Sequence, residues 1–216
     1  MSGKVSSRSW GWVVALGAVW GLAEAGLGLG LKSCASLASG SIMTAVALFF
    51  IGAAWSRAGG VAGLPVLIVV AGLFKLFDAR LLSLPVRGGA VANPLFAFLT
   101  EGLAFALVFT LARAAWKSRP LGRSLLGGAS ALLAVAVFPL VKLCTGVPAC
   151  VVPVMGKTSF QAWVYGPWAV GLALLTVPLG ILAGEKLTLR RPRLEFLVVP
   201  ASVAVCLALV ALLRLA

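Results

Sequence analysis

The sequence predicts an all-α fold: a polytopic transmembrane helical bundle of about seven spans, with six spans as the alternative count. Three observations support this prediction. The chain is 62% hydrophobic over 216 residues, whereas soluble domains average roughly half apolar residues. Its mean hydropathy is +1.12. Its apolar stretches are continuous rather than alternating, which favours membrane-spanning helices over a β-barrel.

The first apolar run covers residues 10–31 and follows a short basic N-terminal segment. A signal peptide has the same general pattern. This run, however, is about 22 residues long, carries the acidic Glu24, and is not followed by a clear small-residue cleavage site. We therefore expect a retained membrane span.

Six further apolar runs follow, each close to the length of about 20 residues that crosses a bilayer as a helix. They lie at residues 38–56, 60–79, 91–112, 124–143, 161–184 and 195–214. A tight link containing Arg57, Gly59 and Gly60 joins the second run to the third. No polar stretch is long enough for a separate soluble domain, so residues 1–216 are predicted to form a single integral membrane domain.

The formal net charge is +13, from 18 Lys and Arg against five Asp and Glu. Such a charge can indicate nucleic-acid binding, but these basic residues sit in short loops, where they set topology and meet the headgroups of membrane lipids. With the N-terminus in the cytosol, eleven basic residues fall inside, six fall outside, Arg214 among them, and Lys75 lies within a span. We therefore expect no nucleic-acid partner, and a multi-pass protein of the bacterial cytoplasmic (inner) membrane with a cytosolic N-terminus.

Histidine is absent from the chain, which removes His-based catalysis and His metal ligands. Carboxylates remain available as metal ligands, but no spacing of acidic residues demands a metal. We expect no cofactor and no bound metal, and no enzymatic activity because acid-rich and GxSG-type motifs are absent. None of the four cysteines forms a CxxC pair. Cys144 and Cys150 fall in the longest outer loop, residues 144–160, and a disulfide between them is predicted for an oxidising compartment.

Charged residues inside membrane spans are energetically costly and by default indicate function. Glu24, Lys75, Asp78 and Glu101 are such residues, and their depths at about 1.5 Å per residue place all four in the outer half of the bundle. Lys75 and Asp78 are three residues apart and can pair on one side of a helix. Because three acids face one lysine, we predict a shared polar substrate-binding site. One alternative is a buried ion-pair network that sets helix register. Another is that Asp78 extends its carboxylate to the membrane interface.

Two further stretches stand at the outer ends of predicted spans, close to the same depth: Ser39–Met43 and Asn93–Pro94. Their hydroxyl, amide and backbone groups can contact a ligand. The alternative is ordinary capping of helix starts, which Ser and Asn favour. We expect Ser39 and Asn93 to complete the site.

Four segments carry a resemblance to known proteins: Trp20–Gly28, Ser39–Met43, Lys75–Asp78 and Asn93–Gly102. They look like segments of a family of small bacterial membrane proteins. In size and helix content these proteins resemble the substrate-capture (S) components of energy-coupling-factor transporters. The resemblance covers roughly residues 10–115. It implies a helical bundle that binds a micronutrient on its outer side and contacts a transmembrane coupling subunit driven by ATPases.

The sequence thus predicts a membrane protein of small-solute uptake, with a small molecule as its substrate. Two alternatives come from other functional classes. One is an intramembrane lipid-modifying enzyme that uses Glu24, Asp78 and Glu101, although the chain lacks a GxSG-type motif. The other is a membrane assembly factor that binds no ligand.

Overall fold

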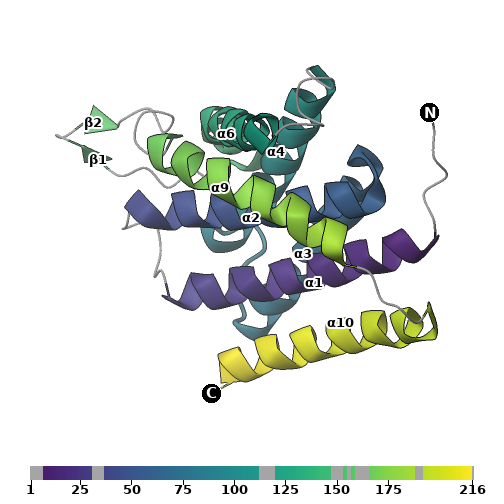
Figure 1. Ribbon diagram of the computed structural model, residues 1–216. Coiled ribbons are helices and arrows are strands. Elements are labelled where there is room, and N and C mark those ends of the chain that lie inside the picture. Colours follow the sequence, from purple (N-terminus) through teal and green to yellow (C-terminus); the bar gives the residue numbers. More distant parts are fainter. Residues whose placement is uncertain are drawn as a thin grey trace.

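The computed structural model describes residues 7–30, 37–111, 120–146, 153–154, 157–158, 166–187 and 192–215 (Figure 1). Its long helices are α1 (Ser7–Gly30), α2 (Leu37–Ala58), α3 (Leu64–Leu81), α4 (Gly89–Leu111), α6 (Pro120–Val137), α9 (Gly166–Lys186) and α10 (Pro192–Leu215). The short elements are η2 (Val61–Gly63), η3 (Phe138–Leu140), α7 (Val141–Thr145) and the paired strands β1 (Pro153–Val154) and β2 (Lys157–Thr158).

Seven helices within the described residues are long and apolar enough to cross a membrane. The predicted all-α bundle of about seven spans is therefore confirmed, and the fold is that of a multi-pass membrane protein. The fifth span begins at Pro120 and ends at Leu140, earlier at both ends than the predicted range 124–143. The earlier start is physically reasonable because proline fits the first turn of a helix, where no backbone N–H is needed.

Helix α2 lies at the centre of the bundle, where it packs along α9, and α9 packs in turn against α6. Helix α1 packs against α3 on one side and α10 on the other, and α10 lies at the edge of the bundle (Figure 1). Fully buried Leu48 and Ile51 of α2 are part of the core. Helix α10 is the least buried of the seven spans, as expected for a helix whose outer face meets lipid.

Close contact between α2 and α9 depends on small residues. A Cβ atom at Gly180 would overlap the carbonyl oxygen of Phe49, and one at Gly184 would overlap the carbonyl oxygen of Ala53. The Ser56 hydroxyl donates a hydrogen bond to the backbone oxygen of Ile181 at 3.0 Å. Small residues and interhelical hydrogen bonds of this kind are the usual means of helix association in membranes, where the hydrophobic effect contributes little.

Helices α2 and α3 are each followed, within two residues, by a residue in the left-handed conformation. Gly59 has φ of 71°, and its neighbour Gly60 donates from its backbone N–H to the Trp55 carbonyl. Ser83 has φ of 51°, and the Leu84 N–H donates to the Ala79 carbonyl at 2.9 Å. These bonds have the Schellman pattern, which satisfies carbonyls at a helix C-terminus and ordinarily uses glycine at the left-handed position.

Replacing Ser83 by glycine is expected to stabilise the protein. A left-handed conformation costs a side-chain-bearing residue about 1–2 kcal/mol, a cost that glycine does not incur. The flexibility of glycine in the unfolded chain offsets part of this gain. In thermal unfolding of the purified protein in detergent, the midpoint temperature should rise slightly for Ser83→Gly. It should fall for Ser83→Val, since a β-branched residue tolerates positive φ worst. A fall for both variants would contradict the expectation.

Candidate functional site

A cavity of about 570 Å³ lies at the end of the bundle where α1, α3 and α10 end and where α2 and α4 begin. The residues that line it include every substrate-binding candidate from the sequence: Glu24, Ser39, Lys75, Asp78, Asn93 and Glu101. All six are buried. The structure therefore brings together residues from four helices that are far apart in the chain.

Helical periodicity explains why several residues of one helix line the cavity together. On α4, Asn93, Ala97 and Glu101 recur every four residues and line the cavity together, since residues at this spacing share one helix face. On α2, Ser39 and Met43 follow the same rule. The pattern is local, so sequence alone places each set on one face.

Asp78 is the most heavily paired of the buried charges, at 1% exposure. Arg214 of α10 approaches it with two nitrogens: Nε lies 2.5 Å from Oδ1 and Nη2 lies 3.1 Å from Oδ2. The same Nη2 donates to the carbonyl oxygen of Ala25 at 3.2 Å. Lys75 Nζ lies 3.6 Å from Asp78 Oδ2. A two-nitrogen arginine–carboxylate contact is among the strongest and most directional of polar interactions.

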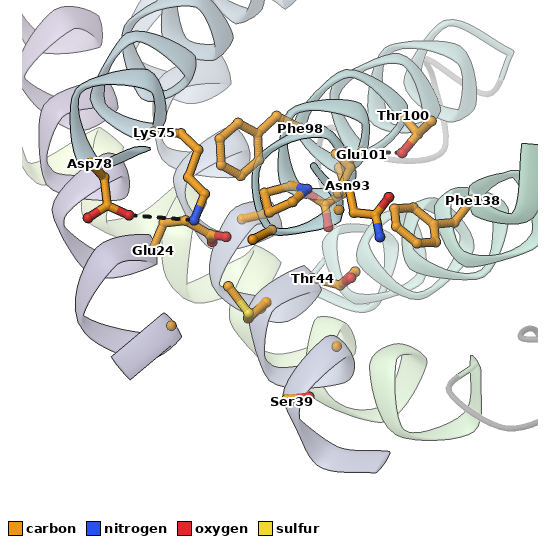
Figure 2. A pocket seen from close by; sticks show the side chains of 18 of the residues that line it. Glu24, Ser39, Thr44, Lys75, Asp78, Asn93, Phe98, Thr100, Glu101 and Phe138 are labelled. Carbon is orange, nitrogen blue, oxygen red and sulfur yellow. Dashed lines mark hydrogen bonds and ion pairs between the residues drawn. The ribbon is translucent and has the colours of Figure 1, made fainter. Parts of the chain in front are cut away.

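Lys75 also interacts with a second acid, Glu24. The Lys75 amine is drawn next to Glu24 and joined to Asp78 by a dashed line (Figure 2). Glu24 interacts electrostatically with both Lys75 and Asp78. Asp78, Lys75, Arg214 and Glu24 thus form one ionic group, which we call the ion-pair end of the cavity.

Glu101 lies at the opposite end of the cavity with Asn93 and Thr100 (Figure 2). The Thr44 side chain hydrogen-bonds Glu101. The Oε2 atom of Glu101 is buried and has no hydrogen-bond partner among the described residues. Buried polar atoms in proteins are nearly always hydrogen-bonded, so this oxygen is an unusual feature. We call this part the Glu101 end.

Aromatic side chains form part of the wall between and around these two ends. Phe98 and Phe138 line the cavity, and Phe98 lies between the ion-pair end and the Glu101 end (Figure 2). Behind Phe98, the fully buried Trp20 packs with its ring centroid 4.6 Å away. Most pockets for small molecules combine an apolar wall with a few placed polar groups, and this cavity has that composition.

Sequence reasoning missed Arg214, Thr44, Phe98 and Phe138 as members of the site. Arg214 was assigned only to the outer surface, as one of six basic residues on that side. Its side chain is instead 7% exposed and paired with Asp78. The available signal was depth, because Arg214 falls in the last turn of its helix at the same end of the bundle as Asp78.

The predicted disulfide lies partly outside the described residues. Cys144 carries an exposed free thiol among the residues that the structure describes. Cys150 is not among those residues. The pairing of the two cysteines therefore stays a prediction.

The three buried acids do not form a metal-ligand cluster. Within the described residues, no group of three or more His, Cys, Asp or Glu is arranged to hold a metal ion. Glu24, Asp78 and Glu101 are instead spread across the two ends of the cavity, as Figure 2 shows.

No family model, curated protein or solved structure matches this chain. The chemistry of the cavity is accordingly argued from its own residues. These are three buried acids, two cationic side chains and an aromatic wall.

Proposed function

We propose that this protein takes part in the uptake of a small solute across the bacterial inner membrane and binds that solute in the cavity. The observation that carries the proposal is the enclosure of three acids and two cations in one cavity of about 570 Å³ within a membrane bundle. Pockets for small ligands typically measure about 300–1,000 Å³. Polar groups buried at membrane depth are expensive and commonly mark substrate pathways.

The proposal includes an orientation. With the N-terminus in the cytosol, the cavity faces the outside, because it lies at the end of the bundle opposite to the start of α1. The excess of basic residues in the loops on the N-terminal side supports this orientation. A solute-capture protein requires such an outward-facing site.

The proposal also includes partners. By its resemblance to the S components of energy-coupling-factor transporters, the chain would work with a transmembrane coupling subunit and ATPases. The sequence contains no complete phosphate-binding loop of the Walker type. Energy for release of the solute into the cell would come from those partners.

Native mass spectrometry of the purified protein in a mild detergent tests this function. The wild-type protein should carry a non-covalent small-molecule adduct, and Glu101→Gln should lose it while remaining folded. Glu185→Gln is the matched control, because Glu185 is exposed and pairs with Arg123 away from the cavity. Absence of any adduct, or an adduct unaffected by Glu101→Gln, would contradict the proposal. A Glu101→Gln protein that loses thermal stability would instead indicate a structural network.

A further inference from the structure

The charges at the cavity are unevenly distributed. Of the five ionisable residues that line it, Arg214 and Lys75 both contact Asp78. Glu24 interacts electrostatically with Lys75, which is already paired with Asp78. Among the described residues, no cationic side chain pairs with Glu101. Among the described side chains that line the cavity, the positive charges are therefore concentrated at the ion-pair end.

One carboxyl oxygen at the Glu101 end also lacks a hydrogen-bond donor among the described residues. Thr44 hydrogen-bonds the Glu101 side chain, but Oε2 has no partner among the described residues although Glu101 is only 4% exposed. Leaving such a buried group unsatisfied is costly. A ligand that brings an N–H group to this oxygen would remove that cost.

Glu101 and Glu24 also interact electrostatically across the cavity. When both are ionised, two carboxylates in a poorly solvated space repel each other, and the repulsion grows as the effective dielectric constant falls. A cation placed near both acids would turn this repulsion into attraction. An anion would be repelled by the two acids. The arginine and the lysine that could attract it are already paired with Asp78.

The wall of the cavity fits an organic cation better than a bare metal ion. Phe98 and Phe138 line it, and aromatic faces attract ammonium groups and pack against apolar bodies. The described residues offer no cluster of three acidic, Cys or His ligands, which a metal site would ordinarily need.

From these observations we infer that the cavity selects a small organic ammonium ion. Its N–H groups donate to Glu101 and its charge lies near Glu101 and Glu24, while its apolar body lies along Phe98 and Phe138. This inference rests on the proposed function, because it names the class of solute that the same cavity binds.

Isothermal titration of the full-length protein in a neutral maltoside detergent tests the inference with three probes of matched size. They are 2-phenylethylamine, which is a cation at pH 7, the neutral 2-phenylethanol, and the anion phenylacetate. The wild-type protein should bind the amine at least about tenfold more tightly than the alcohol, since hydrogen bonds to charged groups are worth more than neutral ones. Phenylacetate should bind more weakly still.

Glu101→Gln should reduce the preference for the amine over the alcohol to less than about threefold, and Glu185→Gln should leave it unchanged. Titrating each probe into protein-free detergent corrects for partition of the probes into the micelle. If Glu101→Gln fails to fold, Glu24→Gln serves in its place and should weaken the preference.

The outcomes separate the inference from the proposed function. Equal or tighter binding of the alcohol or of phenylacetate overturns the inference and leaves solute binding intact. A preference for the amine that survives both Glu101→Gln and Glu24→Gln also overturns it. If no probe binds, the inference fails, and if native mass spectrometry then also shows no adduct, the proposed function fails with it.

Discussion

Replacing Asp78 by asparagine is expected to destabilise the protein by about 3–5 kcal/mol, the usual result of breaking a buried ion pair from one side. The change is nearly isosteric, so it removes charge without opening a cavity. It leaves Arg214 and Lys75 buried side by side without their common counterion. Because α10 is the least buried span, its C-terminal end should be the first part of the bundle to detach.

Thermal unfolding in detergent measures this loss, which should lower the midpoint on the order of 10 °C for a chain of this size. Glu185→Gln is the control, since the exposed Arg123–Glu185 pair should contribute at most about 1 kcal/mol. The double variant Asp78→Asn with Arg214→Gln should be more stable than Asp78→Asn alone, because it removes one uncompensated charge. If Asp78→Asn and Glu185→Gln proved equally mild, the ion-pair end would have no structural role.

Replacing Gly180 by alanine is expected to cost about 1–3 kcal/mol, the typical cost of forcing an extra methyl group into a well-packed interior. The new Cβ would overlap the carbonyl oxygen of Phe49, and a backbone atom cannot rotate away as a side chain can. Helices α2 and α9 would have to separate. That movement would also stretch the hydrogen bond from Ser56 to the Ile181 carbonyl.

Gly171 provides a matched control on the same helix. It has open space around the position of a Cβ atom, so Gly171→Ala should be neutral or slightly stabilising, by up to about 1 kcal/mol from helix propensity. Comparing the thermal midpoints of the two variants in detergent isolates the contact with α2 from the general effect of replacing glycine in a helix. Equal midpoints for Gly180→Ala and Gly171→Ala would show that close approach of α2 and α9 is not required.

Local features of the sequence are sufficient to predict the class of fold. The number of spans and the tight link at Gly59 follow from local properties, namely the length of apolar runs against bilayer thickness and the need for a left-handed residue at a helix end. The sequence also singled out the charged residues that line the cavity, because a charge in an apolar run is costly wherever the helix packs.

Contacts between residues on different helices depend on how the helices pack. Arg214 and Asp78 are 136 positions apart in the chain, and Ser56 and Ile181 are 125 apart. Such pairs depend on which helices become neighbours, and a hydrophobic period of 3.6 residues carries no information about neighbours. For the same reason, the sequence assigned Arg214 to the surface, whereas the packing of α10 beside α1 and α3 buries its guanidinium against Asp78.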